Sequence, residues 1–71
     1  MDDEEVVNLR VWETISRMHP GVSLTARLLA IDIKRLDFVE SIGEYLDKLT
    51  RFGWLRRDGL RYVWRGWRTD G

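Results

Sequence analysis

The chain is predicted to fold as a small α+β domain that is mostly α-helical, a three-helix bundle followed by a C-terminal β-hairpin. Three observations predict this order. Apolar residues recur at helical spacing through the first fifty residues. Gly53 follows the last of them, where a left-handed residue commonly ends a helix. Asp58-Gly59 then separates two short runs with alternating side chains, which is a strong signal for a two-residue hairpin loop.

Seventy-one residues allow one domain, and we assign residues 1–71 to it, with 1–3 and 67–71 expected to fray. A domain of this size buries only about 60% of its unfolded surface. The sequence has no cysteine, so neither a disulfide nor a thiolate-bound metal can stabilise it. We therefore expect the four tryptophans and other aromatic residues, or a partner subunit, to supply the missing stability.

The first helix is expected over residues 4–18. Its apolar stripe consists of Val7, Val11, Ile15 and Met18, with Trp12 beside it. His19-Pro20-Gly21 ends the helix, because a proline disfavours helical geometry at the residue before it. Val22 and Ser23 are expected to form a short extended segment that pairs with the hairpin.

The second helix is expected to begin after Ser23, a good N-cap residue, and to end near Ile31 or Asp32. Its apolar stripe consists of Leu24, Leu28 and Ile31, widened by Leu29, so the helix should be well buried. Asp37 followed by Glu40 has the spacing of a capping box and predicts that a third helix starts at Phe38. The alternative is one continuous helix over residues 24–51.

The third helix is expected over residues 38–52. Its inner stripe consists of Val39, Ile42, Leu46 and Leu49, flanked by Phe38, Tyr45 and Phe52. Gly43 in its interior costs about 1 kcal/mol relative to alanine, and we expect it to allow another helix to approach closely.

In the hairpin, an Asp58-Gly59 loop places Arg57 opposite Leu60 and Arg56 opposite Arg61. The face predicted to pack on the helices carries Leu55, Arg57, Leu60, Tyr62 and Trp64, and the other face carries Trp54, Arg56, Arg61, Val63 and Arg65. Like charges directly opposite each other destabilise a hairpin. An anion or an acidic partner at the second face would explain its three arginines, and the alternative is that they are solvated or stacked on Trp54.

The charge of the chain is unevenly placed. Residues 1–50 hold six Lys/Arg against ten Asp/Glu, a net of −4, whereas residues 51–71 hold six Arg against two Asp, a net of +4. The net charge of zero is therefore a dipole whose basic pole is the hairpin and the tail after it. Arginine supplies ten of the twelve basic residues. Either codon usage or the suitability of the planar guanidinium group for phosphate and base edges would account for that ratio, and codon usage does not explain the clustering.

Residues 45–55, Tyr-Leu-Asp-Lys-Leu-Thr-Arg-Phe-Gly-Trp-Leu, resemble the YLxxLxxxGWL segment that joins the recognition helix to the wing in many winged helix-turn-helix domains. Residues 23–36 are similar to the second helix and turn of that superfamily, and the resemblance extends over about residues 6–65. It implies that the third helix enters the major groove of DNA and that the hairpin, the wing, contacts phosphate or the minor groove. The corresponding positions are Glu40, Ser41 and Glu44 in the helix and Arg56, Arg57 and Arg61 in the wing.

The expected recognition face departs from this pattern because it is acidic, and DNA would repel Glu40 and Glu44. Either the wing leads the docking, or the third helix faces something other than DNA. Lys34 and Arg35 would add phosphate contacts before the third helix, unless they belong to an exposed turn. The candidate nucleic-acid-binding residues are Arg56, Arg57, Arg61, Arg65, Lys34, Arg35, Ser41, Lys48 and Arg51.

No catalytic residue, cofactor or metal site is predicted, and the protein is not expected to be an enzyme. The single histidine, His19, has no cysteine near it and is expected to lie at the surface at a helix end. The sequence contains no phosphate-binding glycine loop and no sign of an activated nucleophile. Its longest apolar run, residues 28–31, is far shorter than the roughly 20 residues of a membrane span. The acidic residues 2–5 are unlike a targeting signal, so a cytoplasmic protein without a membrane partner is expected.

Two functions follow from these features. The first is a double-stranded-DNA-binding module, a small transcriptional or recombination regulator with an arginine-rich wing. We expect it to be a homodimer through the first helix, where Val6, Leu9 and Trp12 are candidates to face outward. The alternative is a winged-helix protein–protein interaction module whose partner binds the acidic face of the third helix or the wing. RNA binding is a third possibility.

Overall fold

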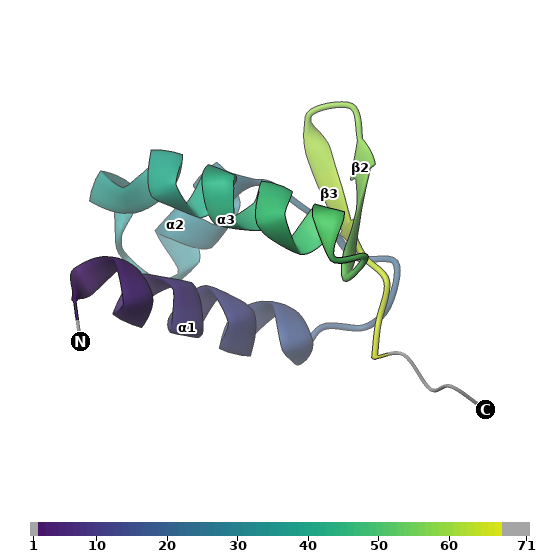
Figure 1. Ribbon diagram of the computed structural model, residues 1–71, viewed down its shortest axis with the longest axis horizontal. Coiled ribbons are helices and arrows are strands. Elements are labelled where there is room, and N and C mark those ends of the chain that lie inside the picture. The colour runs from purple at the N-terminus through teal and green to yellow at the C-terminus, as the bar shows by residue number, and fades with distance from the viewer. Residues whose placement is uncertain (1, 68–71) are drawn as a thin grey trace.

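The computed structural model describes residues 2–67 and contains three helices and a three-stranded antiparallel sheet (Figure 1). The elements in chain order are α1 (Asp3–Ser16), β1 (Ser23–Leu24), α2 (Ala26–Asp32), the 3₁₀ helix η1 (Leu36–Phe38), α3 (Val39–Arg51), β2 (Leu55–Asp58) and β3 (Arg61–Trp64). The strand order is β1-β3-β2. The predicted fold class is confirmed: the molecule is α+β, mostly helical, with a C-terminal hairpin in a winged-helix-like layout.

Helix α1 buries its predicted stripe, but it begins one residue earlier than predicted and ends at Ser16 instead of residue 18. The side chain of Asp2 accepts a hydrogen bond of 2.8 Å from the backbone nitrogen of Glu5 and so caps the first turn. Val7, Val11 and Ile15 are fully buried on its inner face. Of the residues expected to fray, Met1 and residues 68–71 lie outside the described part of the chain, whereas Asp2 and Asp3 form the cap and first residue of α1.

All four tryptophans pack against one another where α1 meets the base of the hairpin. This tryptophan cluster consists of Trp12, Trp54, Trp64 and Trp67, with ring centroids 5.4 to 6.1 Å apart. The indole nitrogen of Trp64 donates to the carbonyl of Met18 at 3.0 Å, and that of Trp67 donates to the carbonyl of Ser16 at 3.1 Å. Ser16 is the last residue of α1, where a helix leaves its acceptors unpaired, and Met18 lies just after the C-cap residue Arg17. The cluster thus joins the hairpin and the chain after it to α1.

Helix α2 starts later than predicted. Its N-cap is Thr25, whose hydroxyl accepts from the backbone nitrogen of Leu28 at 3.1 Å, and not Ser23. Ser23 is in β1 instead, where it pairs with Val63 of β3, so the expected extended segment is found one residue further on. The buried residues of α2 also differ from the predicted ones: they are Leu29 and Ala30, and Ile33 just after the helix is buried with them.

The predicted apolar stripe of α2 is therefore wrong in two of its three positions. Leu24 is buried, but as part of β1, while Leu28 and Ile31 are each 51% exposed. Leu29, which was expected to widen the stripe, is at its centre and 1% exposed. A two-turn helix buries one narrow face. In α2 that face carries Leu29 and Ala30, so Leu28 and Ile31 lie on the opposite side at the surface.

A sharp turn separates α2 from α3, so the continuous helix over residues 24–51 is excluded. Lys34 has a φ of 60°, which no helix residue adopts. The expected capping box is absent, because the N-cap of α3 is Phe38 and makes no side-chain cap. The 3₁₀ helix η1 provides acceptors for the first backbone nitrogens instead of a side-chain cap. The nitrogen of Phe38 donates to the carbonyl of Arg35, and that of Val39 donates to the carbonyl of Leu36.

Helix α3 buries most of its predicted inner stripe. Ile42, Leu46 and Leu49 are buried, and Val39 is half-buried against the core. Phe52, expected beside the stripe, is 68% exposed because it follows the last helical residue.

The hairpin forms where predicted, but with a different register. Leu55 pairs with Trp64, Arg57 with Tyr62 and Asp58 with Arg61, so the loop residues are Gly59 and Leu60. Gly59 has a φ of 62°, and a glycine at the first loop position is typical of a type II′ turn. This register replaces the expected pair of like charges, Arg56 and Arg61, with the opposite charges of Asp58 and Arg61. Because the shift is two residues, the strand side chains keep their predicted faces.

We predict that Gly43→Ala stabilises the protein. A methyl group at this position would lie 3.8 Å from the Cβ of Ala26 in α2, which is ordinary van der Waals contact. Alanine is favoured over glycine inside a helix by about 1 kcal/mol, and a gain of that size raises Tm by roughly 4–8 °C in a domain of this length. Thermal unfolding followed by far-ultraviolet circular dichroism measures the change. A lower Tm would show that α2 and α3 have less room than this distance indicates.

We predict the opposite result for Gly66→Ala. Gly66 has a φ of +84°, and an added Cβ would lie 2.7 Å from the Cγ of Pro20. The rigid proline ring cannot turn aside, so the segment that carries Trp67 onto the cluster must shift. A loss of about 1–3 kcal/mol in the free energy of unfolding is expected from backbone strain of this kind, measured by urea unfolding. Unchanged stability would show that the segment at Gly66 moves without cost.

Candidate nucleic-acid interface

The hairpin projects from the helical body (Figure 1). Its outer face is basic, because it carries Arg56, Arg61 and Arg65. Arg56 and Arg61 are exposed there, and neither side chain has a hydrogen-bond or ion-pair partner within residues 2–67. Arg65 continues the same alternation and donates from Nη1 to the carbonyl of Gly53 at 3.1 Å. Since Arg56 lies opposite Val63, the two unpaired arginines are not directly across from each other.

Arg57, on the inner face, is held by groups of the molecule itself. Its Nε donates to the carbonyl of Gly59 at 2.7 Å, and its Nη1 lies 3.2 Å from both the Asp47 carboxylate and the Tyr62 hydroxyl. The guanidinium also lies over the Tyr62 ring, 4.8 Å from its centroid. The carboxylate of Asp47 therefore offsets the charge of Arg57, which makes it a poorer phosphate ligand than Arg56 or Arg61.

Tyr62 completes this network by donating a hydrogen bond from its hydroxyl to Asp47 Oδ1. Burial raises the pKa of Tyr62 above its ordinary value, and the hydrogen bond to Asp47 raises that pKa further. The network fastens the hairpin to α3. It was missed at the sequence level because the expected register put Arg57 opposite Leu60, when Arg57 and Tyr62 are in fact direct partners.

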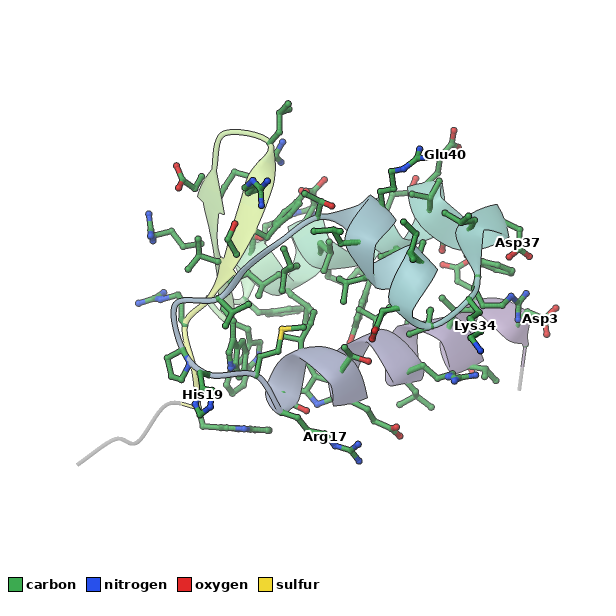
Figure 2. The ribbon with its side chains drawn as sticks, turned by 180° about the vertical axis from the view of Figure 1, so that it is seen from behind. Asp3, Arg17, His19, Lys34, Asp37 and Glu40 are labelled. Carbon is green, nitrogen blue, oxygen red and sulfur yellow. The ribbon has the colours of Figure 1, made fainter. Side chains whose placement is uncertain are left out.

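Of the two basic residues in the turn before α3, Arg35 is paired with a carboxylate and Lys34 is not, within the described part of the chain. Arg35 binds Asp37 through two hydrogen bonds of 3.1 Å and lies 4.6 Å from the ring centroid of Phe38. The hydrogen bond raises the pKa of Arg35 and lowers that of Asp37. Lys34 is exposed and has no charged partner among the described residues. It lies near Asp3 in Figure 2, at the end of the molecule away from the hairpin.

The remaining candidate residues line a groove between α1 and α3. This groove has a volume of about 400 Å³ and is lined by Glu4, Asn8, Ser41, Glu44, Tyr45, Asp47, Lys48 and Arg51. The side-chain oxygens of Asn8 and Ser41 are buried, and neither has a hydrogen-bond partner among residues 2–67. Asn8 was not predicted to line a groove. The sequence signal for it is its position next to the buried Val7, which places it at the edge of the inner stripe of α1. Acidic and basic groups share this groove, so it does not form a basic surface as a whole.

Charge is separated along the length of the molecule, whose longest extent is 38 Å. Figure 2 shows Asp3, Asp37 and Glu40 at the end remote from the hairpin. Helix α3 runs from that end towards the hairpin (Figure 1), with Lys48 and Arg51 in its last turn. The structure therefore brings Lys48 and Arg51 to the hairpin end of the molecule, with Arg56, Arg61 and Arg65. Lys34 and Arg35 belong to the other end.

No family model, curated protein or solved structure matches this chain. Membership of the winged helix-turn-helix superfamily, which the residue pattern implies, therefore stays an expectation. None of the helices within residues 2–67 has the length and apolar character needed to cross a membrane.

We predict that the protein loses stability at alkaline pH partly through Tyr62. Its pKa is raised on folding, so the native state keeps a proton that the unfolded chain releases above about pH 10. This contribution is complete below that pH and is lost as the pH rises through the higher native pKa. Tyr62→Phe should make the fall above pH 10 shallower.

At neutral pH the same substitution should cost about 0.5–1.5 kcal/mol, because it removes the hydrogen bond to Asp47. Urea unfolding from pH 8 to pH 11 measures both effects. Tyr45→Phe is the matched control for the loss at neutral pH. Burial also raises the pKa of Tyr45, but no side-chain hydrogen bond contributes there, so this variant should not show that loss. An equally steep alkaline fall in wild type and Tyr62→Phe would contradict the assignment.

Proposed function

We propose that the protein is a small DNA-binding module whose hairpin contacts the phosphate backbone of duplex DNA. The observation that supports this most directly is the projecting hairpin, with Arg56 and Arg61 unpaired within the described residues and Arg65 beside them. A guanidinium group can bind a phosphate through two parallel hydrogen bonds. Each phosphate contact of this kind releases counterions and contributes binding that does not depend on base sequence.

Helix α3 is expected to assist through its end rather than its beginning. Glu40 and Glu44 are exposed in its first half, and carboxylates there would be repelled from a major groove. Lys48 and Arg51 are exposed next to the hairpin and extend the basic surface. The hairpin therefore leads the docking, with the acidic end of the molecule held away from the duplex.

We also propose a regulatory role in transcription or recombination and a cytoplasmic location, both of which the sequence led us to expect. A module with five exposed basic residues at one end that are not paired with a carboxylate within residues 2–67 is expected to bind weakly and with a steep salt dependence. The residues are Lys48, Arg51, Arg56, Arg61 and Arg65.

The second candidate function is a protein–protein interaction module. The observation in its favour is the acidic end formed by Asp3, Asp37 and Glu40, which is suited to a basic protein surface and not to DNA (Figure 2). Arg57 and Arg35 are already paired with carboxylates, which leaves fewer arginines for phosphate than the sequence suggests.

We predict that Arg56→Ala/Arg61→Ala weakens binding to duplex DNA and flattens its salt dependence. The slope of log K against log salt should become shallower by about 1 for each arginine removed. Fluorescence anisotropy of a labelled duplex, titrated between about 50 and 200 mM salt, measures this slope. The matched control is Arg10→Ala/Arg17→Ala, which removes the same charge from exposed positions of α1 and the residue after it.

If both double variants lose the same affinity and slope, net charge and not the hairpin governs binding. If wild type does not bind at about 50 mM salt, DNA binding is wrong and the acidic interaction module becomes the better proposal.

A further inference from the structure

Two aromatic rings are exposed at the base of the hairpin. Phe52, which follows the last residue of α3, is 68% exposed, and Trp67, three residues after the end of β3, is 60% exposed. The other aromatic residues in the described part of the chain are buried or half-buried. They include Trp12, which was expected to face outward from α1 and instead packs in the tryptophan cluster. Phe52 and Trp67 are thus the two rings that the fold leaves largely in contact with solvent.

Hydrogen bonds hold the two segments that carry these rings side by side. The backbone nitrogen of Arg65 donates to the carbonyl of Trp54 at 3.1 Å, and its Nη1 donates to the carbonyl of Gly53, also at 3.1 Å. The indole of Trp67 lies 5.5 Å from that of Trp54, centroid to centroid. Since Phe52 directly precedes Gly53, the two exposed rings belong to one region of the surface.

An arginine accompanies each ring. Arg51 directly precedes Phe52, and Arg65 lies two residues before Trp67. Both arginines are exposed, and neither forms an ion pair with a carboxylate within residues 2–67. We call these four residues, Arg51, Phe52, Arg65 and Trp67, the aromatic–arginine patch. It combines positive charge with aromatic surface.

Neither ring of the patch has a stacked partner among the residues that the structure describes. The three indoles that contact Trp67 lie at 73° to 90° to its plane, and its N–H edge is directed at the carbonyl of Ser16. Within residues 2–67, Phe52 forms no ring pair and has no guanidinium group over it. Both rings can therefore receive a flat partner.

Nucleic acid with unpaired bases matches this combination of groups. Arginines pair with its phosphates, and its bases stack on aromatic side chains, where removal of a ring costs about 5- to 150-fold in affinity per base. Inside a duplex the faces of the bases are covered by the neighbouring base pairs, so a protein reaches them only where bases are unpaired. An aromatic ring thus adds nothing to a contact with duplex phosphates, whereas it adds affinity for a single strand.

We propose that the aromatic–arginine patch binds the unpaired bases of a single DNA strand that continues from a duplex. This inference rests on the proposed function, in which the outer face of the hairpin contacts duplex phosphates. Phe52 and Trp67 each stack on a base of the single strand, and Arg51 and Arg65 contact its phosphates. Stacking depends little on which base is present, so the patch recognises the single-stranded extension and not its sequence.

The test compares three DNA ligands that share one duplex. The first has blunt ends, the second has a single-stranded overhang of about six nucleotides, and the third has an overhang of the same length whose sugars carry no bases. Because the two overhangs hold the same phosphates, a difference between them is due to the bases. Fluorescence anisotropy at about 50 mM salt should show at least about tenfold tighter binding of the overhang with bases than of the overhang without them.

Phe52→Leu should lower this preference at least about fivefold and leave binding of the blunt duplex unchanged. Leucine keeps an apolar side chain at the surface but has no ring, and Phe52 is outside the tryptophan cluster, so the attachment of the hairpin to α1 is kept. Phe52→Trp should retain the preference because it retains a ring. The matched control, Leu36→Ala, shortens an exposed apolar side chain of η1 and should retain it too.

Equal binding of all three ligands by wild type would overturn this inference and leave the duplex-binding proposal standing. The same conclusion would follow if Phe52→Leu kept the preference, or if it lost as much affinity for the blunt duplex as for the overhang. Binding of the overhang with bases and not of the blunt duplex would support the inference and contradict the proposed duplex contact. If wild type bound none of the three ligands, the proposed function and this inference would both be wrong.

Discussion

The contact between the tryptophan cluster and the end of α1 is the constraint on which the rest of this structure depends. The chain is too short for a large core, and the hairpin has little sheet to support it, since β1 contributes two residues. The cluster supplies the attachment. Trp54 and Trp64 come from the base of the hairpin and Trp12 from α1, and two indole nitrogens donate to the carbonyls of Ser16, at the end of α1, and Met18, just after it. Fixing the base in this way lets the tip extend into solvent. The Asp47–Tyr62 hydrogen bond makes a second attachment, to α3, and together they set the direction of the hairpin.

The sequence predicted the parts of the fold that depend on periodicity. The stripes of α1 and α3 were correct because each spans three or more turns, so one misplaced residue does not change the side that is buried. Helix α2 has two turns, too few for its apolar pattern to decide which side is buried, and the choice of Ser23 over Thr25 as its N-cap was also wrong. That choice depends on a long-range pairing between β1 and β3, which no local pattern shows. The hairpin register failed for a related reason: both the Asp58-Gly59 loop and the observed Gly59-Leu60 loop place a glycine at a position of positive φ, so the local sequence does not decide between them.

The candidate site was predictable as a region but not residue by residue. Clustering of arginine located the basic end, and the alternation of strand residues assigned Arg56, Arg61 and Arg65 to one face. Sequence cannot show which guanidinium groups are already bound within the molecule. Arg57 and Arg35 look like their neighbours in the sequence, yet each has a carboxylate at 3.1 or 3.2 Å in the fold. Their partners are Asp47, ten residues earlier in the chain, and Asp37, which was expected to cap a helix.

The placement of all four indoles in one cluster also determines what an optical signal from this protein reports. Indole emission comes from a single location, where ring centroids are at most 6.1 Å apart and excitation can pass between them. The emission spectrum therefore reports the packing of the hairpin on α1, and a conformational change at that contact alters the signal of all four indoles. Local opening of α2, which contributes no indole, would leave the spectrum unchanged while the amide protons of that helix exchange. A comparison of the two readouts would separate motion of α2 from unfolding of the whole molecule.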